Sequence, residues 1–154
     1  MSMNTLILNY RIEKIEINSF VIDVSFYKEK AAIFSNKEFE IACDDFAHIV
    51  KVKSSFSLHC ENEDSNFLSI EQTMYYGIHP EEYSKLIYQK EGVAYFNRFL
   101  LKKLKQEAYD SLRGSLFVKT ENISFNKFYV PVWQVPLDEE DRKMEKIGNV
   151  PVDI

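Results

Sequence analysis

Hydrophobic and polar positions alternate over a long stretch in the middle of the chain. Most even positions from Val50 to Cys60 are apolar, whereas the odd positions from Lys51 to Glu61 are polar. Successive side chains of a strand point to opposite faces, so this period predicts a strand with one buried and one wet face. The segment from Phe67 to Ile78 repeats the pattern after a polar turn, which predicts an antiparallel hairpin.

Two further strands are predicted before this hairpin. Apolar positions alternate from Leu6 to Ile17 with one slip in phase, as in a strand that carries a bulge. Another strand begins at Phe39 and continues to Cys43. The segment from Tyr27 to Lys37 reads as a connecting loop with an apolar centre, Ala31–Phe34, which we expect either to tuck under the sheet or to contact a ligand.

The spacing of apolar positions changes in the second half of the chain. Pro80 ends the sheet, because proline lacks an amide donor, and the segment from Tyr83 to Tyr88 fits either a short helical turn or an extended strip. Beyond Gly92, apolar residues recur at intervals of three and four: Val93, Phe96, Leu100, Leu104, Ala108 and Leu112. This spacing predicts a helix from Val93 to Leu112 that Gly114 terminates.

These elements together predict an α+β fold. A four-stranded, meander-like antiparallel sheet is packed with one long C-terminal helix, because a sheet with one apolar face must be covered. We assign residues 1–136 to this domain. Residues 137–154 mix acidic and basic side chains without periodicity, so we expect a loosely attached tail.

Charge and cysteine content narrow the class of protein. A net charge of -5 argues against a nucleic-acid binder, which needs a concentrated basic surface. Cys43 and Cys60 lack a CxxC spacing and are expected to be reduced, buried thiols. No stretch approaches the roughly 20 apolar residues of a spanning helix and none resembles a signal peptide, so we expect a cytoplasmic protein without membrane insertion.

The sequence contains no recognisable catalytic or metal-binding constellation. His59, Cys60 and Glu61 are adjacent, but neighbouring residues of a strand point to opposite faces and cannot share a metal. No histidine is placed to activate Cys60, and the chain has no glycine-rich phosphate loop. We therefore expect neither an enzyme nor a cofactor. The 12 Phe and 9 Tyr then belong to the core or to a surface that binds something apolar.

The order of four segments resembles that of the SecB-type protein-export chaperones and their SecB-like relatives. The segments are Tyr10–Ile15, Phe67–Gln72 running on to Ile78, Arg113–Phe117 with its Arg-Gly pair, and Pro131-Val132. The family's proline near the helix start is absent, as is a convincing second C-terminal helix, which suggests a divergent member. The resemblance implies a dimer of dimers that holds unfolded or precursor polypeptides without ATP.

The resemblance also implies two kinds of site. A client groove is expected at apolar residues of the loop, the strip after the last strand and the helix start: Phe26, Ile33, Phe34, Tyr76, Ile78, Tyr83, Leu86, Tyr88 and Phe96. The other reading of these side chains is ordinary core. Acidic residues on the polar side of the sheet are expected to meet the SecA motor, or to form a solvated face: Asp44, Asp45, Glu61, Glu63, Asp64 and Glu71.

Three functions fit these observations. The first is an ATP-independent holdase that keeps clients competent for export or protects a specific client. The second is a small-molecule-binding or enzymatic α+β protein with an apolar pocket between helix and sheet. The third is an antitoxin-directed chaperone of a toxin–antitoxin system.

Overall fold

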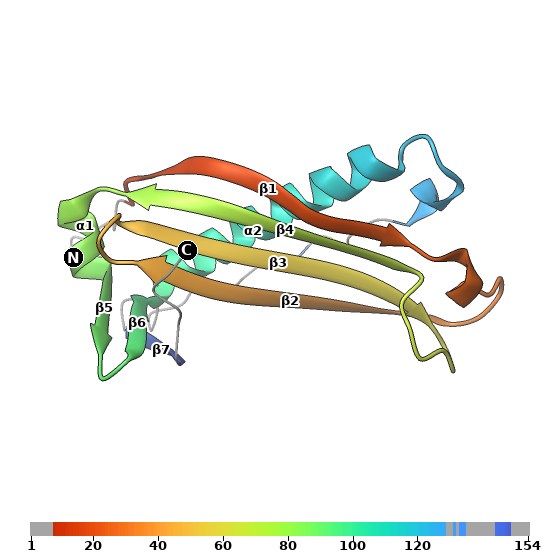
Figure 1. Cartoon of the computed structure of the whole chain (residues 1–154), viewed down its shortest axis with the longest axis horizontal. Helices are drawn as coiled ribbons and strands as arrows, with labels where there is room; N and C mark the ends of the chain where they lie inside the picture. The colour runs from red at the N-terminus through yellow and green to blue at the C-terminus, as the bar shows by residue number, and fades with distance from the viewer. Residues whose placement is uncertain (1–7, 129–130, 132, 135–143, 149–154) are drawn as a thin grey trace, which may run out of the picture.

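A computed structural model describes residues 8–128, 131, 133–134 and 144–148 of the chain. Figure 1 shows a long four-stranded sheet with one long helix crossing behind it and a small second sheet at one end. No helix within the described ranges is long and apolar enough to cross a membrane.

The large sheet contains β1 (Tyr10–Ile22), β2 (Ile33–Asp44), β3 (Ile49–Cys60) and β4 (Leu68–Ile78). Its strand order is β1-β4-β3-β2 and every pairing is antiparallel, which confirms the predicted α+β class. Strands β2, β3 and β4 form a meander, and β1 pairs with β4 at the far edge. The register of β1 shifts between Ile12 and Lys14, where the phase slip predicted a bulge.

The predicted loop from Tyr27 to Lys37 is wrong in its second half. Strand β2 already begins at Ile33, which pairs with Cys60. A short 3-10 helix, η1 (Val24–Phe26), lies between β1 and β2. The start of β2 shows no alternating pattern because residues 35–38 are exposed on both faces of an edge strand.

The long helix α2 (Arg98–Thr120) starts later than predicted. The side chain of Asn97 accepts a hydrogen bond from Leu100 N at 3.1 Å, an N-cap that fixes the helix start at Arg98. The preceding residues, Val93–Asn97, form β6. Val93 and Phe96 match a helical spacing by sequence, but the strand buries Ala94 and Phe96 in alternation.

The helix also ends later than predicted. Gly114 lies exposed inside α2, with open space where a Cβ would project. The buried stripe continues past it to Leu116 and Thr120, so packing against the sheet outweighs the low helix propensity of one glycine. A second 3-10 helix, η2 (Ser124–Lys127), follows.

A three-stranded sheet, absent from the sequence prediction, forms at one end of the molecule. It contains β5 (Ile87–Lys90), β6 and β7 (Met144–Gly148), and α1 (Pro80–Leu86) leads into it. The segment from Tyr83 to Tyr88 thus divides between a helix and a strand. Strand β7 pairs with β6, which corrects the expectation of a loosely attached tail for these five residues; the rest of the tail lies outside the described residues.

Helix α2 covers one face of the large sheet, and two apolar clusters fill the space between them. Polar contacts fix the position of the helix on the sheet: Gln72 Nε2 donates to Ser111 Oγ at 2.9 Å, and Tyr10 donates to Glu107 at 2.6 Å. Cys43 and Cys60 are free and fully buried, as predicted for structural thiols. Burial raises the pKa of the Cys43 thiol, so it is a poor nucleophile.

Candidate client-binding surface

Five of the nine expected client residues are core side chains. Tyr76, Ile78, Tyr83, Leu86 and Phe96 are at most 4% exposed and belong to the cluster beneath the end of α2. They face inward because β4, α1 and β6 all contribute their apolar side chains to the same core cluster as the first half of α2. This corrects the expectation of a continuous accessible strip.

The other four expected client residues are accessible to different degrees and lie at two ends of the molecule. Tyr88 is 46% exposed and stacks on Tyr95 in the small sheet, with ring centroids 4.9 Å apart. Phe26, Ile33 and Phe34 lie at the opposite end, where η1 connects to β2 (Figure 1). A single surface therefore does not contain all four.

The connection between β1 and β2 is anchored to the sheet. Asp23 N donates to Phe67 O at 2.9 Å, and Glu61 N donates to Ala32 O at 2.8 Å. The ring of Tyr27 packs on Phe67, with centroids 5.0 Å apart. Phe26 and Ala31 are half-buried against the same cluster, whereas Ala32, Ile33 and Phe34 are exposed, so the apolar segment Ala31–Phe34 does not tuck under the sheet as a whole.

Ile33 and Phe34 point to opposite faces of the large sheet. Ile33 pairs with Cys60, a buried core residue, and so lies on the face that carries α2. Phe34 is half-exposed on the outer face and stacks on His59, with centroids 5.5 Å apart. Only Ile33 belongs to the helix side, where apolar surface is continuous with the core.

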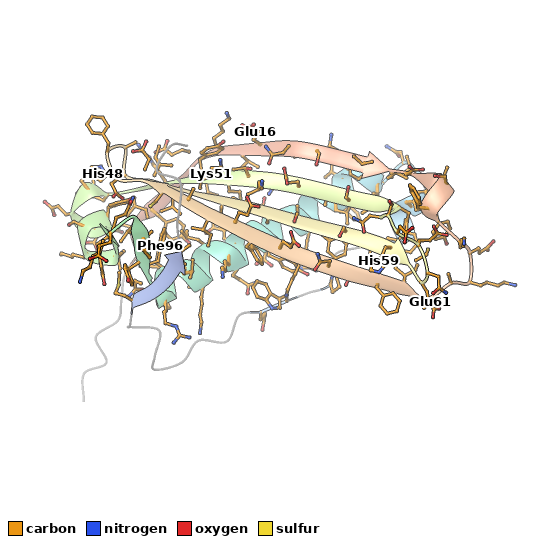
Figure 2. The ribbon with its side chains drawn as sticks, turned by 60° about the horizontal axis from the view of Figure 1, so that its bottom comes forward. Glu16, His48, Lys51, His59, Glu61 and Phe96 are labelled. Atoms are coloured by element: carbon orange, nitrogen blue, oxygen red, sulfur yellow. The ribbon has the colours of Figure 1, made fainter. Side chains whose placement is uncertain are left out.

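The expected acidic partner site is dispersed. Figure 2 shows Glu61 beside His59 at one end of the sheet and His48, which follows Asp44 and Asp45, at the other. Most of these carboxylates have partners within the chain: Asp44 accepts from Phe46 N at 3.0 Å, and Asp45 accepts from the Tyr83 hydroxyl. Glu63 pairs with Lys28 at 2.6 Å, and Glu71 lies 3.7 Å from Lys53. The structure does not bring these acids together into one patch.

A cavity of about 310 Å³ lies between the edge strand β2 and helix α2. Its lining residues come from β2, β3, α2 and the segment that follows the helix: Ser35, Asn36, Lys37, Phe56, Tyr109, Pro131 and Trp133. Desolvation lowers the pKa of Lys37 and raises that of Tyr109. Ile33 does not line this cavity, but it is 37% exposed and lies two residues from Ser35 on the same face of β2.

Sequence reasoning missed this groove because its parts are far apart along the chain. Lys37 lay within the predicted loop, and Trp133 followed the last predicted element. The only local signal for the groove was the strand-like spacing of Ile33, Ser35, Lys37 and Phe39 at every second position. Because Ser35 and Lys37 are polar, these positions do not form an apolar stripe that would identify a strand.

A second cavity, of about 500 Å³, lies at the other end of the sheet, where β1 begins and β4 ends. Its charged residues Arg11 and Glu13 form an ion pair at 2.6 Å. Beneath the central strands β3 and β4, core side chains fill the space between the sheet and α2, which disfavours a ligand pocket at that position.

The architecture and the groove together define a class: an antiparallel sheet covered by a long helix, with a partly apolar groove at the sheet edge. No protein-family model and no curated protein matches the sequence. A solved structure of similar fold is that of the SecB-like chaperone Rv1957 from Mycobacterium tuberculosis, in complex with a ChAD peptide from the Rv1956 HigA1 antitoxin.

The similarity to Rv1957 spans most of both chains. Its TM-score is 0.52 at 11% sequence identity, and it covers 83% of this chain and 93% of the other. At this identity the likeness is one of fold. It agrees with the fold that the sequence resemblance implied.

Proposed function

We propose that this protein is an ATP-independent holdase chaperone that binds non-native polypeptide segments. The observation that carries the proposal is the shared fold with a SecB-like chaperone whose structure contains a bound peptide. The groove between β2 and α2 supplies a surface of suitable chemistry, because apolar and aromatic side chains border polar ones there.

The physical basis of the proposed activity is competition with aggregation. An unfolded chain exposes apolar segments, and a protein that binds them lowers the concentration free to associate. Aromatic side chains suit this task, since they supply contact area at low entropic cost and tolerate many client sequences. No nucleotide is needed, because binding alone shifts the equilibrium.

We propose that the protein acts in the cytoplasm and that it binds either many different clients or one specific client. A general export chaperone binds many precursors and meets a motor such as SecA, whereas a dedicated chaperone protects one partner such as an antitoxin. The antitoxin peptide bound by Rv1957 supports the second range. Aggregation assays with several unrelated clients separate the two, since a dedicated chaperone suppresses the aggregation of a narrow set.

Replacing Ile33 with aspartate is expected to weaken client holding more than the same change at Phe34. Burial of an isoleucine side chain on binding contributes about 1.5 kcal/mol, so Ile33→Asp should raise the half-maximal concentration roughly tenfold. Phe34→Asp is the matched control, because Phe34 lies on the other face of the sheet. The measurement is light scattering of a chemically unfolded protein diluted into buffer without ATP.

Two results would contradict this proposal. Scattering that the wild-type chain leaves unchanged for every client at stoichiometric concentration would exclude a general holdase. Equal losses for Ile33→Asp and Phe34→Asp would separate the activity from the groove side of the sheet.

We further propose that the protein assembles with copies of itself, as a dimer of dimers. Three isoleucines of the edge strand β1 are 40 to 50% exposed: Ile12, Ile15 and Ile17. They pair with Tyr76, Met74 and Gln72 and so lie on the face that carries α2. Uncovered apolar side chains on an edge strand favour association, and a second copy removes them from water.

The double variant Ile15→Asp, Ile17→Asp is expected to shift the protein to a monomer in sedimentation velocity. Two buried carboxylates disfavour an apolar interface by several kcal/mol. Val24→Asp is the control, because Val24 is 67% exposed outside β1 and should leave the assembly intact. A wild-type monomer at micromolar concentration would overturn this part of the proposal.

A further inference from the structure

Trp133, the single tryptophan of the chain, is held in a small aromatic site on the surface of the groove. Its ring stacks on Phe39 with centroids 5.5 Å apart and meets the edge of Tyr109 at 5.2 Å. Lys37 Nζ lies 3.7 Å from the centre of the ring. An ammonium at this distance attracts the ring electrostatically, so β2 and α2 together recognise an aromatic side chain.

The same site also holds main-chain atoms. Gln106 Nε2 donates to Trp133 O at 2.6 Å, and Tyr109 donates to Pro131 O at 2.6 Å. Carbonyl groups two residues apart point to the same side of an extended chain. Gln106 and Tyr109, which lie three residues apart on α2, bind the carbonyls of Pro131 and Trp133, and an extended polypeptide offers two carbonyls at the same sequence spacing.

Pro131 and Trp133 leave part of the groove between β2 and α2 empty. The cavity of about 310 Å³ borders Pro131 and Trp133 and continues along Ser35 and Lys37 of β2. Among the described strands, β2 pairs only with β3, so its outer edge is not part of a ladder. Trp133 remains half-buried rather than enclosed.

We propose that Pro131 and Trp133 are an internal occupant of the client site, and that an extended client segment bearing an aromatic side chain binds by displacing them. This inference rests on the proposed holdase function and names its ligand class. Another peptide can reproduce both kinds of contact. Its aromatic ring can stack on Phe39 next to the Lys37 ammonium, and two of its carbonyls can accept hydrogen bonds from Gln106 and Tyr109. The internal segment thereby competes with clients and lowers their apparent affinity.

Tryptophan fluorescence tests the displacement directly in the full-length wild-type chain. The probe is a seven-residue peptide of alanine and serine with one central tyrosine, which contributes no tryptophan emission. As the peptide saturates the protein, the emission of Trp133 should shift to longer wavelength and acrylamide quenching should increase. A peptide with alanine in place of the tyrosine should bind at least tenfold more weakly.

The variant Trp133→Ala tests the competition. A labelled tyrosine peptide, followed by anisotropy, should bind this variant at least fivefold more tightly than the wild type, because the internal competitor is gone. Phe117→Ala is the control, since Phe117 is 68% exposed on the outer side of α2, and its peptide affinity should be unchanged. The emission measurement on the wild type decides the question even where Trp133→Ala does not fold.

The outcomes separate this inference from the proposed function. Peptide binding without a change in Trp133 emission, or unchanged or weaker peptide affinity in a folded Trp133→Ala variant, overturns the displacement while aggregation suppression stands. Failure to suppress aggregation with intact displacement overturns the holdase function and retains the peptide site. Absence of peptide binding overturns the displacement.

Discussion

Replacing Phe67 with alanine is expected to lower the free energy of unfolding by about 3 to 5 kcal/mol. The Phe67 ring is fully buried, and the rings of Tyr27, Phe125 and Phe128 lie 5.0, 5.8 and 5.2 Å from it. Truncation leaves a cavity between the β1–β2 connection, which carries Tyr27, and the segment after α2, which carries Phe125 and Phe128. Urea unfolding followed by circular dichroism measures the loss.

Phe46→Ala is the matched control for this prediction. Phe46 lies in the turn between β2 and β3 and is 93% exposed, so the same change in composition removes almost no buried surface. Its effect should stay within about 0.5 kcal/mol of zero. Equal losses for Phe46→Ala and Phe67→Ala would show that the aromatic cluster does not stabilise the fold as described.

The protein is expected to lose stability steeply at alkaline pH. Desolvation raises the pKa of both Tyr76 and Tyr83 well above the usual value, and the hydrogen bond from Tyr83 to Asp45 adds to the effect. Unfolded tyrosines lose their protons near pH 10, whereas the buried ones keep theirs. Their contribution to stability is therefore complete below about pH 10 and is lost as the pH rises above it, because the unfolded state then binds fewer protons.

Above about pH 10 the two tyrosines together should reduce the free energy of unfolding by up to about 2.7 kcal/mol per pH unit. Urea midpoints between about pH 9 and 11.5, with tyrosinate absorbance of the folded state, measure this slope. Tyr83→Phe removes one titrating group, so its slope should be shallower than that of the wild type by up to about 1.4 kcal/mol per pH unit. A wild-type slope that Tyr83→Phe leaves unchanged would show that Tyr83 titrates normally.

The regular elements with a strong periodic pattern were predicted correctly from sequence. Strand β3 has a polar face and an apolar face at every second residue, and β4 repeats this after a polar turn. The phase slip in β1 located its first bulge. Such patterns are local, because each residue's neighbours on the same face are fixed by backbone geometry alone.

The boundaries of α2 could not be read from periodicity. Val93 and Phe96 continue the helical spacing, yet the Asn97 cap starts the helix later, and pairing with β5 and β7 makes the preceding residues a strand. At the other end, the packing of Leu116 and Thr120 carries the helix past Gly114. In both places a tertiary contact outweighs a local preference.

The candidate site depended even more on tertiary structure. Sequence could identify aromatic residues suited to a client, but not whether each faced the core; Tyr76 and Phe96 became fully buried, while Phe34 remained half-exposed. Nor could it bring Lys37, Tyr109 and Trp133 together, since they come from three separate segments.

The sequence by itself determined an α+β chain with an antiparallel sheet, a long covering helix, buried thiols and an acidic surface charge. These properties follow from composition and from patterns that repeat within a few residues. Only the tertiary structure decided which edge of the sheet is open, which aromatic rings are accessible and where Trp133 lies. Those outcomes depend on contacts between residues distant in the chain, for which no local pattern exists.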